Sequence, residues 1–478
     1  MGIAKLYGQK AIGMNINGII KDYHAYAGEN ISAGDLVEYI NGMASSTVET
    51  SVEYQLNIPK AIELQNGNVF VVRCTGNNLH GSILTISKTA ITEGASFALT
   101  TSGKAMVIGD IVELSNGNVV VLYSHTSSWY YLYGVVCTIN GSTISHGSEK
   151  QINNSSYSGS CVKALVLQND TILILHSYGS DSYVYRTYCT VSGTSITVGS
   201  SGQFLGKGYG NGRFQIEKMA DDKYVFVHSS GSAAGYVYAI AFTISGTTMS
   251  SSGTDVALTS DKYSGSYGLS TCKLQNGDFI ISHIYNTTNR YLKLLICSLS
   301  DLVISKRTDT TIFSEDYTGY YSVVKPVPNG SVLLLYAKRT NSLYYIYGAI
   351  LTINNTTVTT GTSVQLSSNG YDSTSKEMYL LSNGSYLISY YDVYSRIIGV
   401  DNGNNIALSV RFNEYETQVR KTTTSQFDGV AKTSGVGGDE TGHKDLVSIY
   451  TTYKLDTNFA TRDGNAIMTA DGNTFITK

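Results

Sequence analysis

The sequence has few charged residues, three prolines and one tryptophan, and it lacks a long apolar run. Only 14% of its 478 residues are charged, and the net charge is −3. Because nucleic-acid binding needs a basic excess on one face, this composition argues against a nucleic-acid partner. No stretch approaches the roughly 18 apolar residues of a membrane-spanning helix, and residues 1–10 lack the apolar core of a signal peptide. We therefore expect no membrane insertion and no secretion signal.

The sequence also lacks the common motifs of catalysis and metal binding. It contains no P-loop, HExxH motif, nucleophile elbow or EF-hand loop, and its six cysteines have no metal-type spacing. Cys137, Cys189 and Cys297 fall at equivalent points of similar segments. This predicts small buried side chains in a protein that matures in a reducing compartment. We accordingly predict no catalytic residue, no metal and no cofactor.

What the chain does contain is one turn repeated many times. ELQNGNVFVV (63–72) has close counterparts at 113–122, 273–282 and 380–389, each with Asn-Gly between two apolar runs. Asn-Gly in that setting is a strong signal for a β-hairpin. We define the turn position as the residue after the turn Asn or its equivalent. It recurs about every 53 residues, which indicates a repeat architecture, at Gly67, Gly117, Asp170, Asp222, Gly277, Gly330 and Gly384.

Each copy contains four strand-like segments. An apolar strand enters the turn, a second leaves it, and a third and a shorter fourth follow across polar turns. Because open sheets seldom exceed about 10 strands, seven such copies predict an all-β, seven-bladed β-propeller with four-stranded antiparallel blades. Ser46–Leu56 resembles the fourth strand of the sixth copy. We therefore expect Thr50–Leu56 to complete the last blade from the start of the chain.

The segments outside the repeats divide the chain into 1–43, a propeller over 44–410, and 411–478. AGENISAGDLVEYI (27–40) and FDGVAKTSGVGGDETGHKDLVSIY (427–450) together resemble the small β-barrel module of tailed-bacteriophage virion proteins, which occurs in head-decoration, head-fibre and tail-fibre proteins. The resemblance implies a small β-barrel or sandwich built from both chain ends, with a terminal hairpin and with the propeller inserted. It also implies capsid or tail proteins as partners and a place in the virion after synthesis in the bacterial cytoplasm.

Two sets of side chains are candidate binding residues. The loops between blades, and the loop containing Trp129, combine Tyr with Ser, Gly and Asn, which is the composition of a recognition surface. The candidates there are Trp129, Tyr157, Tyr209, Tyr263, Tyr267, Tyr317, Tyr320, Tyr321 and Tyr371. The second set lies six residues after the turn position and would form a ring lining a funnel, unless its members hydrogen-bond to neighbouring blades instead. It comprises Arg73, His176, His228 and His283.

These patterns lead us to expect a non-enzymatic virion surface protein whose propeller binds a host or environmental glycan. One alternative is a purely structural decoration of capsid or tail with no ligand. The other is a glycan-processing propeller enzyme, with carboxylates such as Asp261 and Asp316 supplied by loops of separate blades. The sequence fixes neither the ligand nor whether the protein is a homo-oligomer.

Overall fold

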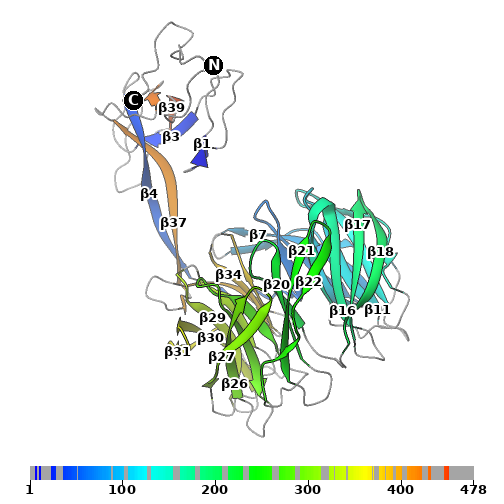
Figure 1. Cartoon of the computed structure of the whole chain (residues 1–478). Helices are drawn as coiled ribbons and strands as arrows, with labels where there is room; N and C mark the ends of the chain where they lie inside the picture. The colour runs from blue at the N-terminus through cyan, green and yellow to red at the C-terminus, as the bar shows by residue number, and fades with distance from the viewer. Residues whose placement is uncertain are drawn as a thin grey trace, which may run out of the picture. The chain divides into compact units, whose positions relative to one another are not determined.

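The chain divides into two units, one of Glu49–Val410 and one of Met1–Val48 with Arg411–Lys478. In the computed structural model (Figure 1) every regular element of the described residues is a strand, apart from the 3-10 turn η1 (Gln168–Asp170). No helix within these residues is long and apolar enough to cross a membrane. The described residues are 6–7, 10–11, 23–27, 36–50, 52–87, 90–101, 106–125, 131–153, 162–177, 183–206, 214–229, 236–260, 268–285, 291–313, 322–327, 329–340, 343–368, 370, 376–382, 384–390, 394–400, 406–407, 409–421, 429–431 and 446–451.

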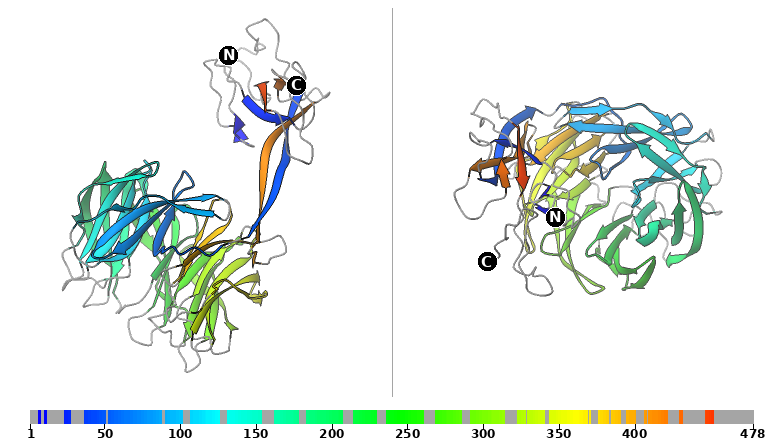
Figure 2. Two further views of the ribbon diagram at one scale, coloured as in Figure 1. Left: turned by 180° about the vertical axis from the view of Figure 1, so that it is seen from behind. Right: turned by 90° about the horizontal axis from the view of Figure 1, so that it is seen from above.

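Glu49–Val410 forms a seven-bladed β-propeller of antiparallel blades, as predicted, and Figure 2 shows the blades arranged around an axis. The innermost strands are β5 (Lys60–Glu63), β10 (Met106–Glu113), β15 (Val162–Val166), β19 (Phe214–Lys218), β24 (Ser270–Lys273), β28 (Ser322–Pro326) and β33 (Lys376–Leu380). The second strands are β6 (Val69–Thr75), β11 (Val119–His125), β16 (Thr171–Ser177), β20 (Lys223–Ser229), β25 (Phe279–Tyr285), β29 (Val332–Thr340) and β34 (Tyr386–Tyr390).

The outer half of each blade is built from a long third strand and a fourth strand that is often split. The third strands are β7 (Asn78–Ser87), β12 (Leu132–Asn140), β17 (Val184–Ser192), β21 (Val237–Ser245), β26 (Tyr291–Ser300), β30 (Leu343–Asn354) and β35 (Tyr394–Val400). The fourth strands are β8 (Ala90–Glu93) with β9 (Phe97–Ala98), β13 (Thr143–His146) with β14 (Lys150–Gln151), β18 (Ser195–Leu205), β22 (Thr248–Ser252) with β23 (Val256–Ala257), β27 (Val303–Phe313), β31 (Thr357–Thr360) with β32 (Val364–Gln365), and β36 (Ile406–Ala407).

The inner hairpins follow from the residues at the turn position. Gly67, Gly117 and Gly384 have φ between 81° and 82°, a conformation that costs glycine nothing and strains other residues. In the third blade Asn169 and Asp170 adopt φ of 56° and 51° in their place. Asn and Asp tolerate this region better than other non-glycine residues, which explains why the repeat accepts them here.

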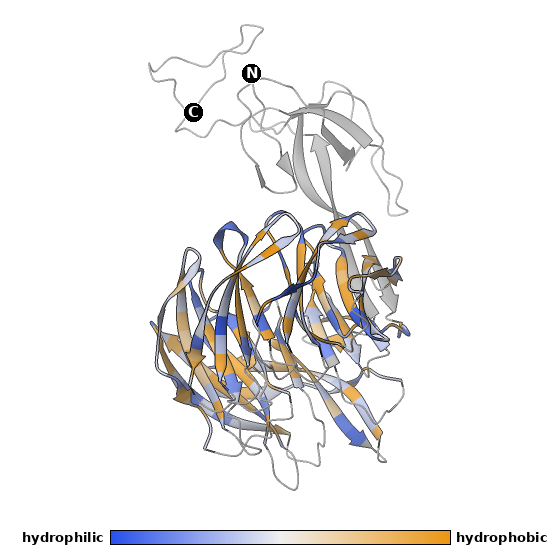
Figure 3. Cartoon of the chain, turned by 90° about the vertical axis from the view of Figure 1, so that its right-hand side faces the viewer, coloured by the Kyte–Doolittle hydropathy of each residue, from blue (hydrophilic) through white to orange (hydrophobic). Residues whose placement is uncertain are grey.

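The core lies between adjacent blades, and the second strands supply its centre. Phe70 and Val72 of β6 pack with Val121 of β11 in one cluster that spans the first two blades. Figure 3 shows apolar residues running along many of the propeller strands. Cys137 belongs to the same cluster, and burial raises the pKa of its thiol to about 12. The cysteines at the repeated positions are therefore apolar core residues, as the sequence predicted.

Thiol labelling should report this core directly. In a Cys161→Ser background, which removes the one cysteine outside the described residues, we expect a single fast-reacting thiol, Cys74, which is exposed. Cys137, Cys189, Cys272 and Cys297 are buried and should react only on unfolding, because a buried thiol is neither accessible nor ionised. Titration with a thiol reagent measures the number of reactive thiols, which should be one in water and five in denaturant. Fast labelling of more than one thiol in water would contradict this packing.

The last blade draws on both ends of the propeller. Tyr54 forms an antiparallel bridge with Ser395 of β35, with N–H to O distances of 2.8 and 2.9 Å, whereas β36 pairs with the far end of β35. The segment EYQLN (53–57) matches EKQIN (149–153) of the second blade. In both, the Glu accepts a hydrogen bond from a second-strand tyrosine: Tyr390 to Glu53 (2.5 Å) and Tyr123 to Glu149 (2.6 Å).

The other unit is described only by the backbone of its strands. These are β1 (Leu6–Tyr7), β2 (Lys10–Ala11), β3 (Tyr23–Ala27), β4 (Leu36–Thr50), β37 (Ser409–Lys421), β38 (Gly429–Ala431) and β39 (Leu446–Thr451). Five of them pair in the closed order β3-β37-β4-β38-β39. Their assignment to the virion module suggested by the sequence stays a prediction.

Candidate functional site

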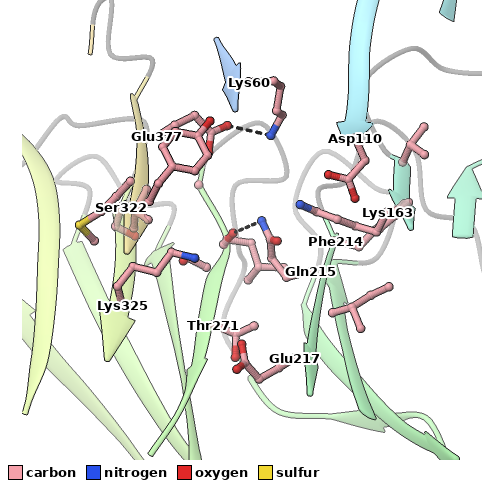
Figure 4. Close-up of a pocket in the computed structure, with 18 of the residues that line it drawn as sticks. Lys60, Asp110, Lys163, Phe214, Gln215, Glu217, Thr271, Ser322, Lys325 and Glu377 are labelled. Atoms are coloured by element: carbon pink, nitrogen blue, oxygen red, sulfur yellow. Dashed lines mark hydrogen bonds and ion pairs between the residues drawn. The ribbon is translucent and has the colours of Figure 1, made fainter. Parts of the chain in front are cut away.

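A cavity of about 230 Å³ lies on the axis of the propeller (Figure 4). All seven innermost strands or the residues just before them contribute to its wall. Two levels of side chains supply most of its polar groups. One level lies seven positions before the turn position in the sequence and consists of Lys60, Asp110, Lys163, Gln215 and Glu377. The other level lies five positions before it and consists of Glu217, Lys325 and Tyr379. Residues two apart in a strand point to the same side, so both levels reach the cavity.

Several of these side chains tie neighbouring blades together. Lys60 Nζ lies 2.9 Å from Glu377 Oε1, an ion pair between the first and last blades. The backbone N–H of Ala164 donates to Asp110 Oδ2 at 2.9 Å, and that of Ala61 donates to the Tyr379 hydroxyl at 3.0 Å. The two hydrogen bonds satisfy backbone N–H groups on the unpaired edges of the innermost strands. Without these bonds the two N–H groups would lack a protein partner.

Lys163 and Lys325 are not used in this way. Within the described residues neither ammonium group takes part in a hydrogen bond or an ion pair, and Figure 4 shows both pointing into the cavity. Desolvation lowers the pKa of Lys163, and the neighbouring Lys60 and Lys325 act in the same direction. Asp110 and Glu377 oppose this shift without reversing it. Two cationic groups thus face the same small space without forming a hydrogen bond or an ion pair to any described residue.

Glu217 is the carboxyl group whose ionisation the cavity alters most clearly. Desolvation raises its pKa to about 6, although the backbone N–H of Lys273 and the charges of Lys325 and Lys273 favour the ionised form. A carboxyl group with a pKa near the working pH can hold a proton and release it. The cavity therefore holds one carboxyl group that can take up and release a proton near pH 6, together with two lysines.

The predicted ring residues lie inside the blades. Arg73 pairs with Glu93 at 2.5 Å, and His228 Nε2 lies 2.9 Å from Asp255 Oδ1. His176 Nε2 lies 3.1 Å from Thr187 Oγ1, and burial lowers the pKa of His176 to about 4. His283 is 1% exposed. None of the four lines the axial cavity, and the partners of the first three belong to the same blade rather than to neighbouring blades. Their role as a ligand ring stays a prediction.

The tyrosines of the third strands pack both between blades and within them. Tyr133 packs against the cluster shared by the first two blades. Tyr238 stacks on His228 of its own blade, with ring centroids 5.5 Å apart, and Tyr185 stacks on His176. These residues face one another across the second and third strands. Cross-strand stacking of aromatic rings stabilises a sheet, so these tyrosines brace the blades.

The predicted glycan-binding residues lie outside the described residues. They are Trp129, Tyr157, Tyr209, Tyr263, Tyr267, Tyr317, Tyr320, Tyr321 and Tyr371, and the loop carboxylates Asp261 and Asp316 lie outside as well. In the described part of the chain, no group of three His, Cys, Asp or Glu residues is placed to hold a metal ion.

Sequence reasoning missed Lys163, Glu217 and Lys325. Each stands in a short strand on a different blade, so nothing local marks them as neighbours. An alignment of the repeats at the turn position does mark Glu217 and Lys325. At the equivalent position the first three blades have the apolar residues Ile62, Val112 and Leu165. A charged residue at an otherwise apolar level of an innermost strand is the mark of a side chain at the axis.

Comparison with known proteins gives a fold likeness without a family. No family model and no curated protein matches the chain. The NanB sialidase of Streptococcus pneumoniae is 10% identical over 63% of this chain and 66% of its own length, with a TM-score of 0.39. A Bacteroides fragilis protein assigned as a 6-phosphogluconolactonase is 11% identical over 73% and 96%, with a TM-score of 0.46. An ulvan lyase is 10% identical over 76% and 96%, also with a TM-score of 0.46.

These findings correct the expectation of a non-enzymatic surface protein: the similar structures named above are a sialidase, a lyase and a protein assigned as a lactonase, and none of these three is named as a virion protein. At such TM-scores the likeness assigns no role to any residue, so residue roles must come from the cavity itself.

Proposed function

We propose that the propeller is a glycan-processing enzyme with its active site in the axial cavity. The observation that supports this is Glu217, whose pKa of about 6 suits a proton donor, in the same cavity as two lysines that form no hydrogen bond or ion pair to the described residues. The cavity, at about 230 Å³, is smaller than the roughly 300–1,000 Å³ of pockets for drug-sized ligands. It would therefore admit one sugar ring or a similarly small part of a longer chain.

In this proposal Glu217 acts as the general acid. It donates its proton to the leaving oxygen while the bond between that oxygen and the sugar carbon breaks. In hydrolysis the oxygen of a water molecule bonds to that carbon and the water gives up a proton to solvent. In elimination a neighbouring C–H group gives up its proton to solvent, and the electron pair of that bond forms the carbon–carbon double bond. The polar side chains of Gln215 and Thr271 in the cavity wall would bind sugar hydroxyl groups and orient the ring. Product analysis decides between hydrolysis and elimination, because only elimination leaves a carbon–carbon double bond in the product.

The rate should depend on pH in a way that follows from Glu217. Because the donor must be protonated, kcat/KM should fall as the pH rises through about 6, where Glu217 loses its proton. A reducing-end assay over a panel of acidic and neutral glycans, repeated from pH 4 to 9, measures both substrate and profile. Absence of turnover on every glycan in the panel would count against the proposal. So would a rate that stays constant across pH 6.

A second proposal concerns the terminal strands. The resemblance of 27–40 and 427–450 to virion modules supports a role for β3, β37, β4, β38 and β39 in attachment to a capsid or tail protein of a phage particle. The enzyme would then act from the particle surface. Co-sedimentation of the full chain with particles, compared with a chain in which 427–450 is replaced by a Gly/Ser linker, tests this. Equal co-sedimentation of both chains would rule it out.

A further inference from the structure

We infer that the axial cavity binds an anionic group on the sugar, a carboxylate or a phosphate ester, between the ammonium groups of Lys163 and Lys325. This inference rests on the proposed function for the same cavity and adds the class of substrate to it. Lys163 lies on β15 and Lys325 on β28, and Figure 4 shows them reaching into the cavity from different walls.

The charges that line the cavity compensate these two lysines only in part. Lys60 and Glu377 neutralise each other in an ion pair. Asp110 accepts the backbone N–H of Ala164, and no ion pair joins it to Lys163. Glu217 loses its negative charge on taking up a proton near pH 6. Below that pH, Lys163 and Lys325 are therefore opposed only by Asp110 among the unpaired groups of the cavity wall.

A bound anion would offset the electrostatic repulsion between the ammonium groups of Lys163 and Lys325. Lys325 disfavours the charged form of Lys163, which shows that the two ammonium groups repel each other. An anion between them would replace this repulsion with two attractions, in a site where water screens poorly. Neutral sugars gain nothing from either lysine. The cavity should therefore select acidic sugars over neutral sugars of the same size.

Binding of simple sugars to the full chain tests the inference. We expect isothermal titration calorimetry at pH 6 and low ionic strength to detect glucuronate, glucose 6-phosphate or both, and to detect no binding of glucose. The anion that binds with the higher affinity shows whether the site prefers a carboxylate or a phosphate ester. Lys163→Gln and Lys325→Gln should each weaken anion binding by about tenfold or more, because a hydrogen bond between charged groups contributes roughly 1.5–3 kcal/mol.

Two further variants separate site-specific from general effects. Lys218→Gln removes one positive charge from β19 outside the cavity wall, and it should leave anion affinity unchanged. Lys163→Arg keeps the charge and should retain binding. It should also hold its affinity at alkaline pH, where the wild type weakens as Lys163 deprotonates below the usual range for lysine. The charged groups that set this pKa are Asp110, Lys60, Glu377 and Lys325.

The outcomes distinguish this inference from the proposed function. Binding of glucose as tight as that of both anions would overturn it, as would unchanged anion affinity in both Lys→Gln variants that melt like the wild type. Failure to detect either anion would overturn it too. Glu217→Gln should still bind the anion. A chain that binds acidic sugars through both lysines but turns over no glycan would support the anion site and contradict the enzyme.

Discussion

Replacing Glu217 with Gln should reduce glycan turnover by about 100-fold or more while making the propeller more stable at neutral pH. The loss of turnover follows from removing the proton donor, since general acid–base catalysis typically contributes 10²–10⁴-fold. The gain in stability follows from the pKa of about 6, because the folded protein must hold a carboxylate that burial disfavours. Glutamine of nearly the same shape carries no charge and avoids that cost.

The stability effect has a defined pH window. A carboxyl group whose folded pKa is raised stabilises the fold below its unfolded pKa, near 4.5, and loses that contribution as the pH rises to about 6. The variant should therefore gain up to about 2 kcal/mol over the wild type at pH 7, and almost nothing at pH 4. Melting temperatures at the two pH values measure this difference. Turnover on the glycan panel measures the other half of the prediction.

Glu113 provides the matched control. It lies on the innermost strand β10, its pKa is also raised by desolvation, and it accepts the backbone N–H of Gln65 outside the cavity wall. Glu113→Gln should keep full turnover. A Glu217→Gln variant that is more stable but equally active would show that Glu217 is only a buried carboxyl group. Equal loss of turnover in both variants would point to a general effect on the fold.

Tyr54→Pro should destabilise the whole propeller by several kcal/mol. Proline removes the N–H that donates to Ser395 and disfavours the strand conformation at the bridge that closes the last blade. Without that bridge the outer edge of the third strand of the last blade keeps only the short pairing with β36 near its end, while its inner edge stays paired with β34. An open edge there would weaken a ring whose blades each rely on both neighbours.

Val52→Ala is the control for this experiment, because Val52 is 53% exposed and makes no strand pairing. It should leave the melting temperature within about 1 °C of the wild type, as most surface substitutions change stability by less than about 0.5 kcal/mol. A Tyr54→Pro variant that melts with the wild type would mean that the start of the chain is not needed for closure.

The sequence was sufficient for the propeller because every blade repeats the same local signals. Asn-Gly turns, largely apolar second strands and a fixed spacing are short-range features, and in the structure they form the inner hairpins of the blades. The ring residues recur at one position of the repeat for the same reason. There Arg73, His176 and His228 each contact a polar group farther out in the same blade, and their role in binding a ligand stays a prediction.

The candidate site could not be read in the same way. Glu217 and Lys325 become neighbours only because the ring closes and brings the fourth and sixth blades to one axis. Their chemistry depends on desolvation, which a linear sequence does not display. The sequence instead predicted a binding site in the tyrosine-rich loops, because loop composition can be read from a sequence whereas the burial of a single carboxyl group cannot.

A crystal structure of Glu217→Gln soaked with an acidic oligosaccharide would show whether the axial cavity is the active site. We expect a sugar ring in the cavity, its acidic group between Lys163 and Lys325, and its cleavable oxygen within hydrogen-bonding distance of residue 217. A sugar bound elsewhere on the propeller, with the cavity holding only water, would contradict this expectation.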